Sequence, residues 1–208
     1  MMSDSSAACE IADRLKRGDR DALAAVWSES RGRLLRLIAF RMDRRLQGRI
    51  DPDDVLQESY LAAASRLESY AQSPMSPFVW LRMMVLQTLI DLHRHHLRTE
   101  KRDAAREADI LAGCSGTSAS LAAFFVGSMT SPSQAAARAE TLEQVERAID
   151  VMEPLDREVL AMRHFEELTN SEVAEVLGIQ QKAASMRYVR AIQRLKQVLA
   201  RFSGLFEG

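Results

Sequence analysis

The stretch of sequence best suited to binding another molecule is a basic segment near the C-terminal end. From Lys182 to Arg201 it holds six Lys or Arg residues and no acid. At 100° per residue the basic side chains fall on or beside the face opposite the apolar ones, which predicts one amphipathic helix. The major groove of DNA admits such a helix and presents distinct donors and acceptors to it. The segment therefore favours DNA recognition over the plainer alternative, a basic outer helix of an ordinary bundle.

The position of each side chain along this helix determines which part of the DNA it can contact. In a recognition helix the N-terminal residues contact base edges, whereas other basic residues hold phosphates and fix the register. The base-edge candidates are Gln181, Lys182, Ser185 and Met186. The phosphate candidates are Arg187, Arg190 and Arg194. The expected core face consists of Ala184, Tyr188, Ala191, Ile192, Leu195, Val198 and Leu199.

Signals just before this helix predict the motif that holds it. Thr169 and Glu172 have the spacing of a capping box, which opens a short helix that Gly178 ends. Ile179 is expected to fill the turn before the long helix. Two helices joined by a tight glycine-containing turn are typical of a helix-turn-helix.

A second candidate surface is acidic. Asp51 to Glu58 contains four acids in eight residues and no base. Asp51 before Pro52 is a helix start signal. On that helix Asp54, Gln57, Glu58 and Leu61 share a face at spacings of three and four. Such a face fits a basic partner surface; the alternative is that the acids only complement the helix dipole.

Catalytic and metal-binding patterns are weak. His93 and His96 have the spacing of ligands on one helix face, but no Cys or carboxylate accompanies them in a recognisable arrangement. A solvated or phosphate-facing edge is the favoured interpretation. The acids from Asp51 onward lack the glycine and terminal Glu of a calcium loop. The sequence predicts no enzyme activity, no cofactor and no metal.

The elements that must position these residues are helices throughout, because apolar residues recur at spacings of three and four. The prediction is an all-α protein of two small helical domains joined by a flexible linker, with the helix-turn-helix in the C-terminal one. The domains are expected at residues 10–98 and 131–202. The linker, residues 99–130, is rich in Ala, Ser and Gly. Its apolar run Leu121–Val126 either docks on a domain or forms a recruitment patch.

Composition sets the remaining limits. The chain has 208 residues, a formal net charge of −1 and two Cys, Cys9 and Cys114. Two cysteines cannot build a disulfide framework and fit a reducing compartment. A secretory signal and a membrane-spanning apolar stretch are both missing from the sequence, so we expect a cytoplasmic protein without membrane contact.

Three motifs together resemble bacterial RNA polymerase sigma factors of the extracytoplasmic-function (ECF) group. Asp51–Leu61 is similar to the region-two helix that binds the polymerase clamp. Phe78–Leu81 with the helix after it resembles the part that engages the melted minus-10 element. Leu155–Ala191 resembles region four, which reads the minus-35 element. Ser131–Gln134 and Ala183–Ala191 look closest to the variants of planctomycete-type bacteria.

The resemblance implies roles for particular residues. Contacts with the clamp of the largest polymerase subunit are implied for Asp51, Asp54, Gln57, Glu58 and Leu61. A pocket for a flipped minus-10 base is implied at Tyr70, Ser73 and Gln87, with Arg94 and Arg98 on phosphates. Minus-35 contacts fall on the helix-turn-helix residues given above. Lys182–Arg187 departs from the usual Gly-Thr-Val-Lys-Ser-Arg, and Gln87 stands where many relatives have Asn, which puts the promoter preference in doubt.

The predicted function is therefore a sigma factor that binds core RNA polymerase and directs promoter-specific initiation. Its partners would be the polymerase and promoter DNA, duplex and melted. An anti-sigma regulator is a further candidate partner, although no residue pattern identifies one. The alternatives are a stand-alone helix-turn-helix regulator and, more remotely, a metal enzyme at the His93–His96 edge. A net charge near zero fits the first function, because basic Arg31–Arg49 and Lys182–Arg201 balance acidic segments elsewhere.

Overall fold

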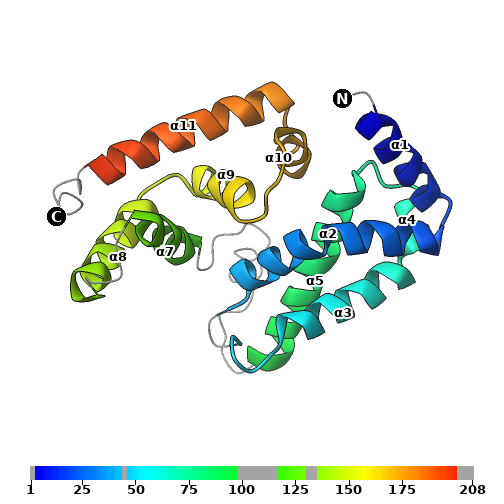
Figure 1. The fold of residues 1–208 in the computed structure, drawn as a ribbon, viewed down its shortest axis with the longest axis horizontal. Coiled ribbons are helices and arrows are strands. Elements are labelled where there is room, and N and C mark those ends of the chain that lie inside the picture. Colours follow the sequence, from blue (N-terminus) through cyan, green and yellow to red (C-terminus); the bar gives the residue numbers. More distant parts are fainter. Residues whose placement is uncertain (1–2, 44–45, 98–116, 130–134, 201–208) are drawn as a thin grey trace. The chain divides into compact units, whose positions relative to one another are not determined.

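The computed structural model describes residues 3–43, 46–97, 117–129 and 135–200. Within these ranges the regular elements are helices, apart from one isolated bridge between Gln47 and Ile50 (Figure 1). The all-α prediction is confirmed. The chain divides into two compact units, Met1–Asp103 and Ala104–Gly208, and each is described by itself.

The first unit is built around three long helices. Its elements are α1 (Ser3–Lys16), α2 (Arg20–Arg41), α3 (Pro52–Ser65), α4 (Leu67–Tyr70) and α5 (Pro77–Leu97). Helices α2, α3 and α5 pack against one another, and α1 lies against α2 and α4. The fully buried side chains at their centre include Leu34, Leu37, Ile38, Leu81 and Leu89. The apolar stripe of each long helix thus forms one shared core.

Local capping fixes where two of these helices begin. The Asp19 carboxylate accepts hydrogen bonds from the amides of Asp21 at 2.9 Å and Ala22 at 3.1 Å, which starts α2. The Asp51 carboxylate accepts from the Asp53 amide at 2.9 Å, and Pro52 is the first residue of α3. Both starts follow the sequence signals, because a cap depends only on neighbouring residues.

The helix that begins at Pro52 is followed directly by a second, short helix. α3 ends at Ser65, and the Arg66 amide donates to the carbonyl oxygens of both Ala62 and Ala63. A shared bond of this kind is common at helix ends. The short α4 then turns Leu67 and Tyr70 into the core, where their exposed fractions are 4% and 0%.

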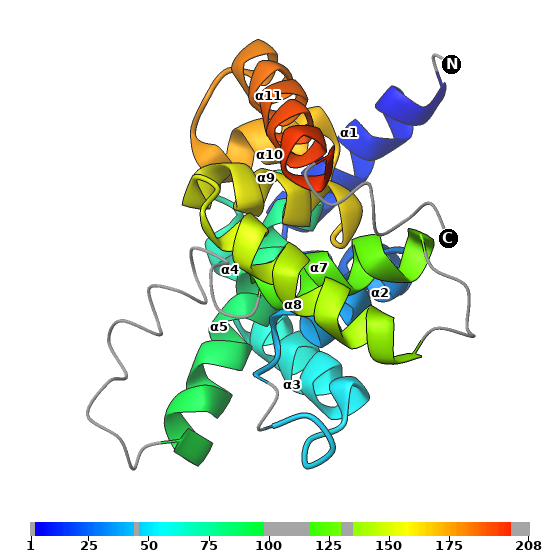
Figure 2. The ribbon, with the colours of Figure 1, turned by 90° about the vertical axis from the view of Figure 1, so that its left-hand side faces the viewer.

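The second unit holds the remaining helices. They are α7 (Thr117–Met129), α8 (Ala135–Asp150), α9 (Pro154–His164), α10 (Asn170–Leu177) and α11 (Gln181–Ala200). α7 lies alongside α8 in both views (Figures 1 and 2), and α11 packs on α9, α10 and α8. Residues of α7, α8, α9 and α11 share one apolar core.

α7 lies inside the segment predicted as a flexible linker, residues 99–130, so the structure differs there. Leu121, Ala122 and Val126 are buried to 1% exposure or less, in the same core as Val145 and Ile149 of α8. Ala-rich composition is compatible with a helix as well as with a linker, and the apolar run supplies the buried face. Of the two alternatives predicted for Leu121–Val126, docking on a domain therefore agrees with the structure. Residues 98–116 and the segment Ser131–Gln134 lie outside the described residues.

The helix-turn-helix has the predicted caps. Thr169 Oγ1 accepts from the Glu172 amide at 3.2 Å, and Glu172 Oε2 accepts from the Thr169 amide at 2.7 Å. Gly178 ends α10 with φ +63°, a left-handed conformation that glycine adopts without steric cost. None of the helices in the described part of the chain combines the length and the apolar character needed to cross a membrane.

Candidate nucleic-acid interface

The long helix α11 presents one exposed face. Ala184, Ala191 and Leu195 are at most 4% exposed and face the core of the second unit. On the other side, Met186 and Val189 are 48% and 47% exposed, although both are large and apolar. Polar and basic side chains surround them on the surface, namely Gln181, Lys182, Arg190 and Gln193. The periodicity of the sequence predicts this division, whereas the predicted core side chains of Val198 and Leu199 lie outside the described residues.

The four base-edge candidates all lie in the first two turns of α11. Gln181, Lys182 and Met186 are exposed, and Ser185 is half-buried. The Ser185 hydroxyl donates to the Gln181 carbonyl oxygen at 3.1 Å, which leaves its lone pairs available as acceptors. The structure therefore places these four side chains on one surface of α11, and a helix surface of this kind can enter the major groove of a duplex.

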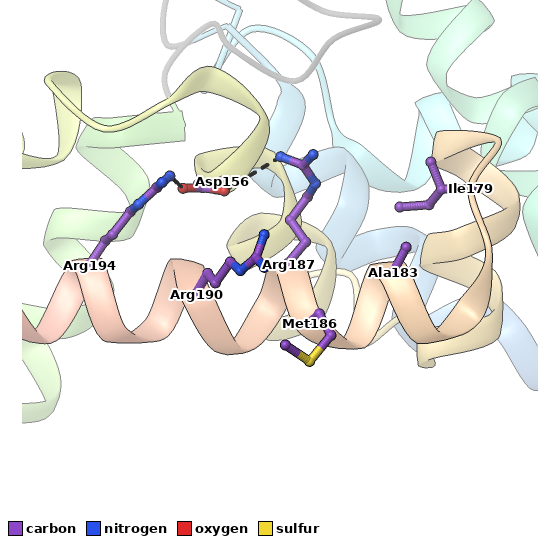
Figure 3. Close-up of a pocket in the computed structure, with 7 residues that line it drawn as sticks. All are labelled: Asp156, Ile179, Ala183, Met186, Arg187, Arg190 and Arg194. Atoms are coloured by element: carbon purple, nitrogen blue, oxygen red, sulfur yellow. Dashed lines mark hydrogen bonds and ion pairs between the residues drawn. The ribbon is translucent and has the colours of Figure 1, made fainter.

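The three phosphate candidates line a hollow between α11 and α9. Its volume is about 310 Å³, and Figure 3 shows its lining residues, with Met186 on the opposite side of the helix from the arginine side chains. The lining consists of Asp156, Ile179, Ala183, Met186, Arg187, Arg190 and Arg194. Three guanidinium groups around one carboxylate make the hollow attractive to an anion.

Asp156 is the unexpected member of this group. Its side chain is 2% exposed, and its carboxylate pairs with two arginines of α11. Arg194 Nη1 donates to Oδ2, and Arg187 Nη1 lies 3.8 Å from Oδ1. A buried carboxylate needs such partners, because an unpaired charge in the interior is strongly destabilising. Within the described residues, Arg190 makes no ion pair.

Aromatic and cationic groups also hold α11 against α9. The Tyr188 hydroxyl and His164 Nε2 are 3.3 Å apart, and the Arg163 guanidinium lies 5.3 Å from the centre of the Tyr188 ring. Burial, and then the positive charge of Arg163, lower the pKa of His164 below its ordinary value. These contacts fix the orientation of α11 relative to α9.

The acidic surface predicted on α3 is also present. Asp54, Gln57 and Glu58 are exposed, and Leu61 is 61% exposed although it is apolar. Val55, Leu56, Ser59 and Ala63 occupy the opposite, buried face. The Asp51 carboxylate is used as the helix cap, and the neighbouring Asp53 forms an ion pair with Arg31. Four of the five predicted contact residues therefore form one free face.

The predicted minus-10 residues fall into two separate pairs. Tyr70 is fully buried, and its hydroxyl donates to the Met75 carbonyl oxygen at 2.9 Å, while Ser73 Oγ accepts from the Met75 amide at 3.2 Å. This placement differs from the expected DNA contact, because the Tyr70 ring lies in the core, 4.9 Å from the Trp80 ring. Tyr70 anchors the loop that follows α4.

The second pair meets on α5. Gln87 Nε2 donates to Asp91 Oδ1 at 3.3 Å, and Arg94 Nη1 lies 3.6 Å from the same oxygen. Gln87 is half-buried and Arg94 is exposed. Arg98 lies outside the described residues. His93 is buried and its Nε2 accepts from the Asp43 amide at 3.3 Å, so the His93–His96 edge does not form an open pair of ligands.

Comparison with known proteins identifies the class of the chain. The family description "Sigma-70, region 4" matches residues 148–197, which contain α9, α10 and most of α11. The chain is also 26% identical over 179 residues to the ECF RNA polymerase sigma factor SigD of Mycobacterium tuberculosis and of Mycobacterium bovis. That alignment covers 86% of this chain and 77% of each relative. Together these likenesses support the prediction of an ECF sigma factor.

The same matches support a function in directing transcription initiation. The match to region 4 contains α10, the turn and α11 as far as Gln197. The solved structure of CnrH in complex with the cytosolic domain of CnrY contains a similar chain, with 21% identity and a TM-score of 0.49. That likeness covers 94% of this chain and 98% of the other. The closer likeness to planctomycete-type variants stays a prediction.

Sequence reasoning missed two residues that join the helices of the second unit. Asp156 stands in the first turn of α9, where an acid is ordinarily explained by the helix dipole. Arg157 Nη1 donates to Ser118 Oγ at 3.2 Å and to Asp150 Oδ1 at 3.1 Å, and so ties α7 and α8 to α9. Neither pairing leaves a local sequence signal, because the partners are supplied by other helices.

Proposed function

We propose that this chain binds core RNA polymerase through the exposed face of α3 and duplex minus-35 DNA through the outer face of α11. The observation that carries the proposal is the exposed, acid-free face of α11, which follows the capped helix α10 and lies mostly inside the region-4 match. Catalysis would remain with the polymerase, and this chain would supply promoter specificity.

The α3 face supports polymerase binding in two ways. Asp54 and Glu58 supply negative charge for a basic partner surface, and Leu61 supplies apolar area that is otherwise unfavourable in water. An exposed leucine beside acids is typical of a contact surface with an apolar centre and a polar rim. The partner would be the clamp of the largest polymerase subunit.

The α11 face supports sequence reading. Gln181, Lys182 and Ser185 offer hydrogen bonds to base edges, and Met186 offers an apolar contact. Arg190 lies one turn further along and is exposed, so a backbone phosphate is its natural partner. These contacts would fix both the register and the base preference at the minus-35 element.

Melted minus-10 DNA would bind at the loop after α4 and along α5. Ser73 is half-buried in a loop that Tyr70 holds in place, and Gln87 has an amide that can bond a base edge. Arg94 and Arg98 are proposed for phosphates. An anti-sigma regulator stays a prediction from the resemblance.

Run-off transcription with core polymerase tests the proposal, and a matched pair of charge reversals sharpens the test. Glu58→Lys reverses a charge on the α3 face, and Glu68→Lys reverses an equally exposed charge on α4. We expect Glu58→Lys to abolish promoter-specific transcripts and core binding in pull-down, and Glu68→Lys to retain both. A wild-type chain that selects no promoter and binds no core enzyme would refute the proposal. Unchanged function of Glu58→Lys would favour a stand-alone regulator.

A further inference from the structure

We infer that Asp156 withholds the charges of Arg187 and Arg194 from DNA phosphates and leaves Arg190 as the phosphate contact of the arginine row, the name used here for Arg187, Arg190 and Arg194. The inference rests on the proposed function of α11. It assigns Asp156, a residue of α9, as a positioning residue for DNA recognition.

The geometry separates the three arginines although they are neighbours on one helix. Spacings of three and four place them on the same side of α11. Figure 3 shows Asp156 between the guanidinium groups of Arg187 and Arg194, and both ion pairs are drawn there. The Arg190 side chain lies between its two neighbours without an ion pair among the described residues.

Burial decides which partner the two paired arginines keep. The Asp156 side chain is 2% exposed, whereas those of Arg187 and Arg194 are 39% and 51% exposed. A phosphate that drew both guanidinium groups away would leave a buried carboxylate without compensation, which is the costly outcome for a buried pair. The exposed Arg190 can neutralise a phosphate without breaking any contact.

The charge balance of the hollow follows from this arrangement. One buried carboxylate cancels one of the three positive charges of the arginine row. Non-specific DNA affinity depends on the number of phosphates that a protein neutralises. Asp156 thereby limits sequence-independent binding, and its two ion pairs hold α11 against α9 with the base-reading face outward.

The test is the salt dependence of binding between the full-length chain and a promoter-free duplex, followed by fluorescence anisotropy. Each neutralised phosphate contributes about 0.9 to the slope of log Kobs against log salt concentration. Arg190→Gln is expected to reduce that slope by about 0.9, and Arg187→Gln and Arg194→Gln by less than about 0.3 each. Asp156→Asn is expected to increase the slope by about 1.2 to 1.8, because both paired arginines become available to phosphates.

A second round places the same arginine substitutions in the Asp156→Asn background. There Arg187→Gln or Arg194→Gln should reduce the slope by about as much as Arg190→Gln does, because the carboxylate no longer compensates them. A purely structural role of Asp156 would not move a salt slope. Thermal unfolding checks each variant, and the single Gln variants leave Asp156 with one guanidinium partner, so they remain informative even where Asp156→Asn fails to fold.

Three results would overturn the inference. The first is that Arg187→Gln or Arg194→Gln reduces the slope as much as Arg190→Gln in the native background. The second is that the wild-type chain shows no salt-dependent duplex binding. The third is that folded Asp156→Asn has the wild-type slope. Failure of the proposed function is separately visible, because it is the loss of promoter selection by the wild-type chain with core polymerase.

Discussion

At the residue scale, the features that could be predicted from the sequence are those that depend on residues close by in the chain. Asp19, Asp51 and Thr169 are helix caps whose partners lie within three residues, and the structure has all three. The roles of Asp156 and Tyr70 were not predictable in this way, since they depend on partners that folding brings close. A buried carboxylate and a buried tyrosine look like ordinary polar residues until their surroundings are known.

Tyr70 provides a test of this distinction. Tyr70→Phe removes the hydroxyl that donates to the Met75 carbonyl oxygen but keeps the buried ring. We expect the first unit to lose about 1 kcal/mol of unfolding free energy, the usual net value of one hydrogen bond. Urea unfolding followed by tryptophan fluorescence reports on this unit, because both tryptophans, Trp27 and Trp80, lie in it.

Tyr60→Phe is the matched control for Tyr70→Phe. Tyr60 is half-buried, its ring lies 5.2 Å from that of Trp27, and no hydrogen bond of its hydroxyl is seen in the described residues. Its stability should remain close to wild type. Equal losses for the two variants would contradict the anchoring role of the Tyr70 hydroxyl.

His164 gives the second unit a dependence on pH. Its pKa is lowered by burial and by Arg163, so the unfolded chain takes up a proton at a higher pH than the folded chain. The unfolding free energy is therefore highest above the ordinary His pKa of about 6.5 and falls as the pH drops toward the lowered value. Far-ultraviolet circular dichroism with urea measures this. His164→Gln should show a weaker decrease than wild type, and parallel curves for the two proteins would count against the assignment.

At the element scale, α10 and α11 were predictable and α7 was not. The capping box, Gly178 and the apolar periodicity all point to the same two helices. In α7 the composition indicates a linker while the apolar run indicates a buried face. Burial against α8 decides between them, and that contact has no local signal.

Leu121→Ala measures how far α7 belongs to the second unit. Leu121 is fully buried in the shared core, so its truncation is expected to cost about 2–5 kcal/mol of that unit's unfolding free energy. Thermal unfolding by calorimetry follows the effect. Ala123→Ser, at an exposed position of the same helix, serves as the control and should change little. A flexible linker would tolerate both substitutions equally, and that result would show that α7 is not part of the folded core.

At the scale of the whole molecule, the net charge of −1 does not reflect the local charge of either proposed binding surface. The described part of α11 beyond Lys182 carries basic residues without an acid, while the exposed face of α3 is acidic. Segregation of this kind was predictable, because charge runs can be read directly from the sequence. The ion pairs of Asp156 with Arg187 and Arg194 were not predictable, and they reduce the positive charge that α11 presents to DNA.

If the surfaces act independently, the local charge and not the total charge will set DNA affinity. Asp54→Asn with Glu58→Gln raises the formal net charge by two, yet it should leave the salt slope of duplex binding unchanged and weaken core-polymerase binding. Lys182→Gln with Arg190→Gln lowers the charge by two and should reduce the slope by about 0.9, through Arg190, without weakening core binding. Anisotropy with a promoter-free duplex measures the salt slope, and pull-down with core enzyme measures core-polymerase binding. Both are measured on the same four proteins: both double variants, the wild type and Glu68→Lys. A slope that follows total charge across this set would mean that the chain binds DNA as a diffuse polyion. An unchanged slope for the α3 variant, with a reduced slope for the α11 variant, places duplex binding on α11 and not on α3.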